Sequence, residues 1–262
     1  MTLDAILAVT RRRVEALKRS AAEIGRAAQK APPIRPFPGK PAATVGVIAE
    51  VKRRSPSQGA IREDLDPIAH ATAYERGGAV AVSVLTDGAH FGGSIDDLKG
   101  VAAAVAVPAL RKDFIIDAVQ VHEARVAGAS AVLLIVRVLR KAELLALANE
   151  VRAFGMVPLI EVHAEAELEA ALAAGPGVLG INARDLDTLV VDARAAEALI
   201  ARVPADVSVV GESGVETRAD VERFAAAGAD FVLVGTSVAR QKDPEKAVRA
   251  LVGVKRQPRV WS

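Results

Sequence analysis

The feature of this sequence that most constrains its fold is a repeated unit: a short β-branched apolar run, a polar loop, and an alanine-rich stretch with helical periodicity. Eight apolar runs follow Thr44, at residues 45–51, 79–85, 108–110, 131–136, 156–160, 178–181, 207–210 and 231–234. Glycine precedes several of them, as in RGGAVAVSV and AAGADFVLV, where a left-handed residue can end a helix. Alternating strands and helices predict a parallel sheet, and eight such units can close into a barrel.

Chain length favours a closed barrel over the open, doubly wound sheet that the same alternation also permits. The chain has 262 residues, 51% of them hydrophobic, and one such barrel takes about 250 residues. An open doubly wound sheet usually has fewer strands. We therefore expect an α/β protein with a single (β/α)8 TIM barrel over residues 44–254, preceded by an N-terminal helical extension and connector (1–43) and followed by a tail (255–262).

The residues before the barrel have a different pattern. Apolar side chains such as Leu3, Ile6, Leu7 and Val14 recur near helical spacing from residue 3 to about residue 30, with Arg, Lys and Glu between them, which predicts one amphipathic helix. The following segment, APPIRPFPGKP, is rich in proline and is expected to be an extended connector. The C-terminal KRQPRVWS is expected to be a solvated tail, with Trp261 docking on the barrel or on a partner.

Composition narrows the class of function. The 34 basic and 32 acidic side chains leave a formal net charge of +2, which argues against nucleic-acid and membrane partners but allows a small phosphorylated substrate. The absence of cysteine excludes disulfides and thiol nucleophiles. The opening MTLDAILAVTRRR does not resemble a signal peptide, and no stretch of about 20 apolar residues is free of charge. We expect a soluble, cytoplasmic protein.

Histidines do not suggest a metal site. His70, His90 and His122 lack carboxylates at the spacing of metal ligands. No metal site is therefore expected.

The ends of the predicted strands carry the candidate chemistry, because a barrel of this type directs those residues into one common mouth. The polar residues at these ends are Glu50, Lys52, Lys112, Asp113, Glu161, His163, Asn182, Arg184, Glu212 and Ser213. Glu50 and Lys52 are two positions apart, so on an extended strand they share a face. Glu161 ends the apolar run MVPLI, where an ionised carboxylate is costly unless it is paired.

Each of these residues also has an ordinary structural interpretation. The run from Lys52 to Arg54 could be a solvated basic loop, and Lys112 could pair with a carboxylate on the barrel rim. A single histidine such as His163 more often packs or forms a structural hydrogen bond, so we leave it outside the catalytic set.

The last two strand ends, in VVGESGV and FVLVGTSVAR, predict a phosphate site. Glycine lets a backbone approach a ligand closely, and a following helix N-terminus offers free N–H groups. Barrels often bind phosphate at this place. The predicted cradle consists of Gly214, Gly235, Thr236 and Ser237. The alternative is that these glycines form tight turns and the hydroxyls cap a helix.

Taken together, the segments IAEVKRRSPSQGAIRED, SVLTDGAHFGGSIDDL, LRKDFIID, VLLIV, LIEVH, GINARDL, VVGESGV and VLVGTSVAR resemble, in this order, the indole-3-glycerol-phosphate synthase family. The resemblance runs from about residue 45 to residue 251. It implies a carbon–carbon lyase that closes, decarboxylates and dehydrates 1-(o-carboxyphenylamino)-1-deoxyribulose 5-phosphate, giving indole-3-glycerol phosphate in tryptophan biosynthesis without a cofactor. The N-terminal extension also resembles the segment that covers the barrel mouth in that family.

The resemblance implies a role for each lysine and its neighbouring acid. Lys112 would be the acid of ring closure, and Glu161 would act as a base or hold the substrate amine. Lys52 would contact the anthranilate carboxylate or protonate the departing hydroxyl, and Glu50 would be the dehydration base or set the protonation of Lys52. Which lysine serves which step stays open, because only geometry and kinetics separate them.

The remaining positions would bind the substrate. Asn182, Glu212 and Ser213 would orient the sugar hydroxyls and support the lysines. The pocket for the anthranilate ring would consist of Phe91, Phe114, Leu133 and Arg184. Phe91 could equally be ordinary rim packing.

Two positions depart from the family pattern. Ala183 stands where many members have a second asparagine, and Arg137 adds a charge near the mouth that could meet phosphate, a carboxylate ligand or a neighbouring acid on the rim.

Two other functions remain compatible with these residues. One is a Schiff-base aldolase on the same fold, with Lys112 as nucleophile. The other is a non-catalytic regulatory subunit that keeps the phosphate pocket and docks through its N-terminal helix. For an enzyme, we expect a monomer acting on a small phosphorylated molecule, alone or in association with other tryptophan-pathway enzymes.

Overall fold

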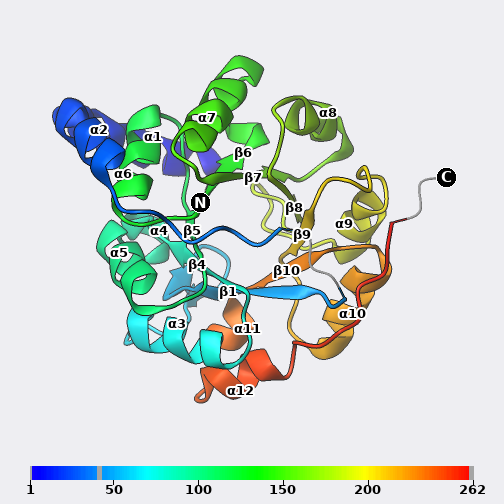
Figure 1. Cartoon of the computed structure of the whole chain (residues 1–262). Helices are drawn as coiled ribbons and strands as arrows, with labels where there is room; N and C mark the ends of the chain where they lie inside the picture. The colour runs from blue at the N-terminus through cyan, green and yellow to red at the C-terminus, as the bar shows by residue number, and fades with distance from the viewer. Residues whose placement is uncertain (1, 40–42, 260–262) are drawn as a thin grey trace.

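The computed structural model describes residues 2–39 and 43–259 of the chain. Within them, eight parallel strands close into a barrel in the order β1-β10-β9-β8-β7-β6-β5-β4 (Figure 1). The barrel strands are β1 (Gly46–Val51), β4 (Ala81–Leu85), β5 (Ala109–Lys112), β6 (Ala131–Ile135), β7 (Val157–Val162), β8 (Val178–Asn182), β9 (Val209–Glu212) and β10 (Phe231–Val234). The predicted barrel is confirmed, and the open doubly wound sheet is wrong.

Several strands run further than the apolar pattern indicated. Backbone pairing continues through their polar last residues: Leu85 pairs with Lys112, Ile135 with Glu161, and Asn182 with Glu212. The charged side chains are therefore held on the sheet itself, where they are more precisely positioned than on a loop.

Helices surround the barrel (Figure 1). They are α3 (Pro67–Arg76), α4 (Gly88–Phe91), α5 (Ile95–Ala104), α6 (Ala118–Val126), α7 (Lys141–Ala153), α8 (Glu165–Ala173), α9 (Ala193–Ile200), α10 (Arg218–Ala226), α11 (Thr236–Ala239) and α12 (Pro244–Arg249), with a 3-10 turn η1 (Val136–Val138). After β1, the chain forms a small hairpin of β2 (Arg54–Ser55) and β3 (Gly59–Ala60).

Side chains alternate between the barrel interior and the helix layer. On β1, Ile48 belongs to the interior cluster, whereas Val47 and Ala49 pack in the layer between strands and helices. Because successive strand residues face opposite sides, Glu50 shares the inward side of Ile48. The interior is filled below the mouth by residues such as Leu110 and Phe231.

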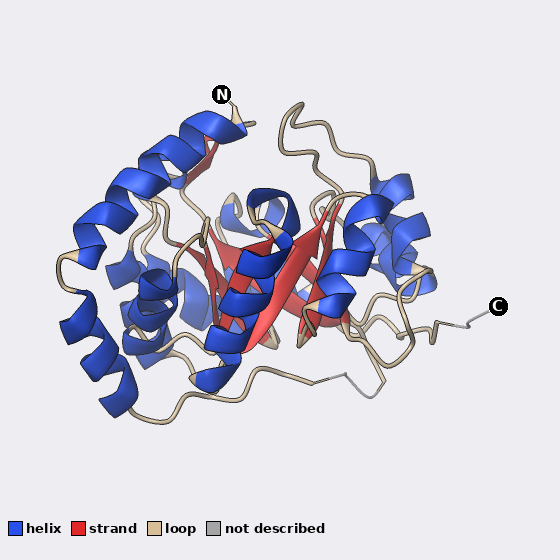
Figure 2. Ribbon diagram, turned by 90° about the horizontal axis from the view of Figure 1, so that it is seen from above, coloured by secondary structure: helices blue, strands red, loops and turns tan. Residues whose placement is uncertain are grey.

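The N-terminal extension consists of two helices, α1 (Leu3–Lys18) and α2 (Ala21–Lys30), which follow one another along one side of the barrel (Figure 2). The prediction of one continuous helix is therefore wrong at Arg19 and Ser20. Ser20 takes a non-helical conformation before α2, as expected for a residue type that favours helix caps over helix interiors. On α1, Arg13 donates a 2.7 Å hydrogen bond to Asp113, directly after β5.

The tail differs from the solvated segment expected. Lys255 forms an antiparallel bridge with Thr44. Arg256 and Arg259 contact the fully buried carboxylate of Asp230, at 2.8 and 3.1 Å. Buried Asp230 needs a positive partner, which the tail supplies. Trp261 lies outside the described residues. No helix in the described part of the chain is long and apolar enough to cross a membrane.

Candidate active site

A cavity of about 660 Å³ opens at the carboxyl ends of the barrel strands. All the site residues predicted from the sequence line it: Glu50, Lys52, Phe91, Lys112, Phe114, Leu133, Glu161, Asn182, Arg184, Glu212, Ser213, Gly214, Gly235, Thr236 and Ser237. The strands thus bring together residues that lie up to 187 positions apart (237 − 50) in the sequence.

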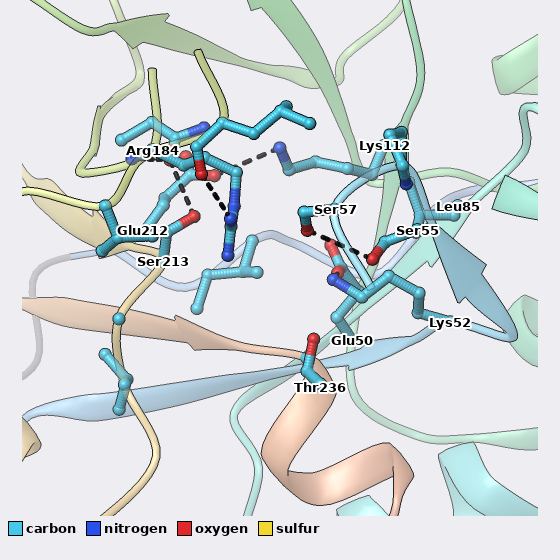
Figure 3. Close-up of a pocket in the computed structure, with 18 of the residues that line it drawn as sticks. Glu50, Lys52, Ser55, Ser57, Leu85, Lys112, Arg184, Glu212, Ser213 and Thr236 are labelled. Atoms are coloured by element: carbon cyan, nitrogen blue, oxygen red, sulfur yellow. Dashed lines mark hydrogen bonds and ion pairs between the residues drawn. The ribbon is translucent and has the colours of Figure 1, made fainter. Parts of the chain in front are cut away.

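One charged cluster in the cavity is centred on Lys112, the last residue of β5. Its Nζ atom lies 2.8 Å from Glu161 Oε2 and 3.2 Å from Glu212 Oε2. Figure 3 shows Lys112 extending across the mouth towards Glu212. Both carboxylates are buried, with side chains only 1% and 2% exposed, so the three groups determine one another's charge.

The protonation states in this cluster follow from burial and charge. Burial disfavours the ammonium, but Glu161, Glu212 and Glu50 outweigh it and raise the pKa of Lys112 above its ordinary value. Burial also disfavours charge on Glu161, but Lys112 and His163 hold the pKa of that carboxyl well below its usual range. Burial, together with neighbouring Glu161, raises the pKa of Glu212 to about 8. At neutral pH the cluster therefore contains an ammonium, a carboxylate and a neutral carboxylic acid.

A second acid–base pair lies at the end of β1. Lys52 Nζ is 2.8 Å from Glu50 Oε1, and Ser83 donates a 3.4 Å hydrogen bond to the other oxygen of Glu50. Gly235 leaves the space that this pair needs: a β-carbon there would lie 2.6 Å from Glu50 Oε1 and 3.0 Å from Lys52 Nζ. Thr236 lies close by (Figure 3). The pair therefore borders the predicted phosphate cradle.

Asn182 and Ser213 are joined between the ends of β8 and β9. Ser213 Oγ donates a 2.8 Å hydrogen bond to Asn182 Oδ1, which also accepts from the Arg184 backbone N–H at 3.0 Å. Ser213 has a φ of 66°, an uncommon value for a non-glycine residue that is often associated with functional sites. The guanidinium of Arg184 donates to Leu189 O at 2.9 Å, and burial lowers the pKa of Arg184.

The predicted phosphate cradle lies at the ends of β9 and β10. Gly214 has a φ of 73°, and the helix α11 starts at Thr236, so its first N–H groups have no partners within the helix. The Ser237 hydroxyl donates to Val215 O at 3.1 Å. The capping interpretation of this serine is therefore wrong, because its hydroxyl joins helix α11 to the loop after β9, and the start of α11 has no side-chain cap.

One wall of the cavity is apolar. The rings of Phe91 and Phe114 lie 6.4 Å apart, centre to centre, and Leu133 lines the same cavity. Leu3 and Ile6 of α1 also line it, so the extension closes one side of the mouth.

Several cavity residues were missed by sequence reasoning, and two groups of them show why. Ser55 and Ser57 line the cavity because the chain after β1 turns back as the β2–β3 hairpin. The local sequence SPSQG indicates a turn, but it does not indicate that the turn lies over the barrel mouth. Leu3 and Ile6 had a clear helical pattern, but periodicity alone does not say where a helix docks.

His163 was set aside, yet it contacts Glu161: its Nε2 atom lies 3.2 Å from Glu161 Oε1. The sequence contained a signal for this contact, because Glu161 and His163 are two positions apart at the end of a strand, as Glu50 and Lys52 are.

Three partners were considered for Arg137: phosphate, a carboxylate ligand and a neighbouring acid on the rim. The structure shows the rim acids, since Arg137 pairs with Glu167 at 3.2 Å and with Asp185 at 3.0 Å.

The other histidines have ordinary partners. His90 contacts Asp87 at 3.2 Å and His122 contacts Glu150 at 2.5 Å, while His70 Nδ1 lies 3.0 Å from the carbonyl of Asp66. In residues 2–39 and 43–259, no group of three or more His, Cys, Asp or Glu side chains is arranged to hold a metal ion.

Comparison with known families gives one match that covers nearly the whole chain. The family model described as "Indole-3-glycerol phosphate synthase" matches residues 3–251. Proteins named indole-3-glycerol phosphate synthase are similar: one from Mycobacteroides abscessus is 50% identical, over 79% of this chain and 76% of its own length. One from Mycobacterium sp. (strain KMS) is 46% identical, over 95% of this chain and 93% of its own length.

Solved structures are similar in fold. The 3-hexulose-6-phosphate synthase from Salmonella typhimurium aligns with a TM-score of 0.61 at 14% identity, over 79% of this chain and 96% of that one. Thiamine phosphate pyrophosphorylase from Pyrococcus furiosus aligns with a TM-score of 0.59 at 16% identity, over 79% and 93%. At these identities the similarity concerns the barrel alone.

Proposed function

The chain belongs to the indole-3-glycerol phosphate synthase family, and we propose that the Lys112 cluster and the Glu50–Lys52 pair carry out the family's reaction in the cavity at the barrel mouth. The enzyme converts 1-(o-carboxyphenylamino)-1-deoxyribulose 5-phosphate into indole-3-glycerol phosphate, carbon dioxide and water, in tryptophan biosynthesis.

Lys112 is the acid of ring closure. The ring carbon that carries the carboxylate attacks the substrate ketone, a carbon–carbon bond forms, and the ketone oxygen takes a proton from the Lys112 ammonium. A general acid must be protonated at the working pH and close to the atom that gains charge. The observation that carries this assignment is the position of Lys112 between Glu161 and Glu212, which keeps it an ammonium. Loss of carbon dioxide then restores the aromatic ring.

Glu161 is the carboxylate that balances Lys112 and holds the substrate amine. It is ionised and 1% exposed, so it can accept a hydrogen bond from the amine without competition from water. Glu212, a neutral acid at pH 7, orients the sugar hydroxyls together with Asn182 and Ser213.

Lys52 and Glu50 serve the dehydration. The hydroxyl formed from the ketone leaves as water after taking a proton from Lys52, and Glu50 removes the proton from the neighbouring carbon, so that the double bond of the indole forms. The 2.8 Å contact between the two side chains supports this division, because a paired acid and base at one place can give and take a proton in the same step.

Binding of the substrate uses the rest of the cavity. Gly214, Gly235, Thr236 and Ser237 hold the phosphate through backbone N–H groups at the loops after β9 and β10. Phe91, Phe114, Leu133 and Arg184 hold the anthranilate ring. We also propose that the enzyme is a monomer with a cytoplasmic location.

The test is turnover by the purified protein. With the substrate alone, without metal or nucleotide, fluorescence of the indole product should appear. Folded protein that binds the substrate without turnover would favour a regulatory subunit instead.

A Schiff-base aldolase requires a neutral lysine as nucleophile. The raised pKa of Lys112 disfavours it. Borohydride with substrate should therefore leave no covalent adduct, and an adduct on Lys112 would support the aldolase.

A further inference from the structure

His163 lies between two carboxylates beside the Lys112 cluster. It follows the end of β7, and its side chain is 2% exposed. Its Nε2 atom lies 3.2 Å from Glu161 Oε1, and its Nδ1 atom lies 3.8 Å from Glu167 Oε2 on α8. A buried imidazole with a carboxylate facing each ring nitrogen is stabilised in its doubly protonated, cationic form.

The carboxylate of Glu167 is itself held in its ionised form. It accepts a 2.7 Å hydrogen bond from the backbone N–H of His163 and a 3.2 Å hydrogen bond from Arg137 Nε. Arg137 in turn contacts Asp185 at 3.0 Å. Charges therefore alternate in sign from Lys112 through Glu161, His163 and Glu167 to Arg137, and each one stabilises the next.

This arrangement makes the two glutamates beside Lys112 unequal. Both contact the ammonium at similar distances, 2.8 Å for Glu161 and 3.2 Å for Glu212. Only Glu161 also has a second cation, His163, beside it. Within the described residues, neither oxygen of Glu212 has a hydrogen-bond partner, and Lys112 is its ion-pair contact.

Two buried carboxyl groups this close do not both ionise readily, so a proton stays on one of them. A cation next to one member of the pair moves that proton to the other member. We propose that His163 is a positioning residue, which keeps the shared proton on Glu212 and leaves Glu161 as the ionised partner of Lys112. This inference rests on the proposed function, because Glu161 must be ionised to balance Lys112 in that reaction, and His163 is the proposed cause of its ionised state.

The pKa shifts of these groups agree with the geometry. Burial disfavours the imidazolium, but the neighbouring carboxylates of Glu161 and Glu167 raise the pKa of His163 to about 9. The two ring nitrogens face these carboxylates as ion pairs, without a hydrogen bond to either. The charged groups that act on the ring are Glu161 on β7 and Glu167 on α8. Arg137 and Lys112 lie beyond these two carboxylates.

The experiment compares the wild-type enzyme with His163→Gln, which keeps a hydrogen-bond donor and removes the charge. We expect kcat at pH 7 to fall about tenfold with KM changed less than about twofold, because without the cation the proton shared with Glu212 should reside mainly on Glu161. The acidic limb of the kcat profile should also move to higher pH, because Glu161 loses a neighbouring positive charge. His122→Gln is the matched control, since His122 also pairs with a glutamate, but with Glu150 on α7 and not with Glu161 or Glu212, which contact Lys112.

A second variant tests the same proposal if His163→Gln does not fold. Glu167→Gln leaves the imidazole in place and removes one of its two carboxylates, so it should move the acidic limb in the same direction by a smaller amount. A third readout is independent of turnover: NMR titration of the imidazoles, assigned by the signal lost in His163→Gln, should give His163 a midpoint near pH 9.

The outcomes separate the two proposals. An unchanged pH profile in folded His163→Gln and Glu167→Gln, or a His163 midpoint near the ordinary value of 6.5, would overturn the role of His163. Absence of turnover by the wild type would overturn the proposed function, and the NMR midpoint would still report on His163.

Discussion

The ammonium of Lys52 lies 2.8 Å from a carboxylate oxygen of Glu50, two positions earlier in the chain. Their shared face was predicted from strand geometry alone. Their common neighbour, Gly235 after β10, was predicted for a different purpose, the binding of phosphate. The structure brings the two predictions together, because a β-carbon on Gly235 would meet both side chains.

Replacing Gly235 with alanine should therefore impair the pair and the cradle at once. The added β-carbon would lie 2.6 Å from Glu50 and 3.0 Å from Lys52, so both side chains must move away. We expect kcat/KM to fall about 100-fold, the scale on which misplaced catalytic groups act, while the melting temperature changes little, because flexible side-chain ends can move. Steady-state kinetics and thermal unfolding would measure this.

Gly39→Ala is the control, since a β-carbon there has nothing within 4 Å. Equal kinetics for Gly235→Ala and Gly39→Ala would contradict the role of Gly235.

Lys112→Met should abolish most turnover and keep the fold. Methionine resembles lysine in length but cannot donate a proton, and Glu161 can take up a proton once its ammonium partner is removed. We expect kcat to fall by about 100-fold to 10,000-fold, the usual contribution of a general acid. Circular dichroism would monitor folding, and competition by inorganic phosphate should be unchanged, because the cradle lies at other strand ends. Normal turnover would remove Lys112 from the mechanism.

The barrel was predictable because the pattern of eight runs and intervening helices reports burial directly. Glu50, Lys112 and Glu212 could be placed at one mouth because a closed parallel barrel aligns its strand ends. The residues that were missed depend on contacts between distant segments. Ser57 reaches the cavity through a hairpin, and Leu3 through the docking of a helix, and neither contact leaves a local signal.

The C-terminal tail was also mispredicted because its contacts are with distant residues. KRQPR is polar and rich in charge, which usually means exposure. The side chain of Arg259 is nevertheless only 2% exposed, because Asp230, directly before β10, needs a cation. A buried acid and its distant partner can be recognised in a sequence only once the fold has brought them together.

Substitutions at Ser213 should separate its hydroxyl from its backbone conformation. Ser213→Gly and Ser213→Ala both remove the 2.8 Å hydrogen bond to Asn182, so both should lower kcat/KM to a similar extent. Only glycine adopts a φ of 66° without strain, so the glycine variant should be more stable than the alanine variant by about 1 kcal/mol. Urea unfolding would measure the difference. A fully active glycine variant would show that the hydroxyl has no catalytic role.

Stability should depend on pH through His163. Its pKa in the folded protein is about 9, above the ordinary value of 6.5, so the folded state binds the proton more tightly than the unfolded state. The stability that this provides is fully present below about pH 6.5 and is lost as pH rises to about 9. The difference in unfolding free energy between wild type and His163→Gln should therefore shrink across this window. Urea unfolding at pH 6, 7.5 and 9 would measure it, and parallel curves would contradict the raised pKa.

Arg259→Met should destabilise the fold without affecting catalysis. Arg259 lies 3.1 Å from Asp230, and its guanidinium also donates to the carbonyls of Gly228 and Val207. Removing one partner of a buried ion pair costs about 3 to 5 kcal/mol, and because Arg256 still contacts Asp230 at 2.8 Å, we expect a loss of about 2 kcal/mol. The kcat should stay unchanged, since Asp230 and both arginines lie outside the cavity lining. Lys141→Met, which removes an exposed ion pair with Glu169, is the control and should change stability little. If both variants unfold at the same urea concentration as the wild type, the tail does not hold the barrel together, and the contacts with Asp230 add nothing to the free energy of unfolding.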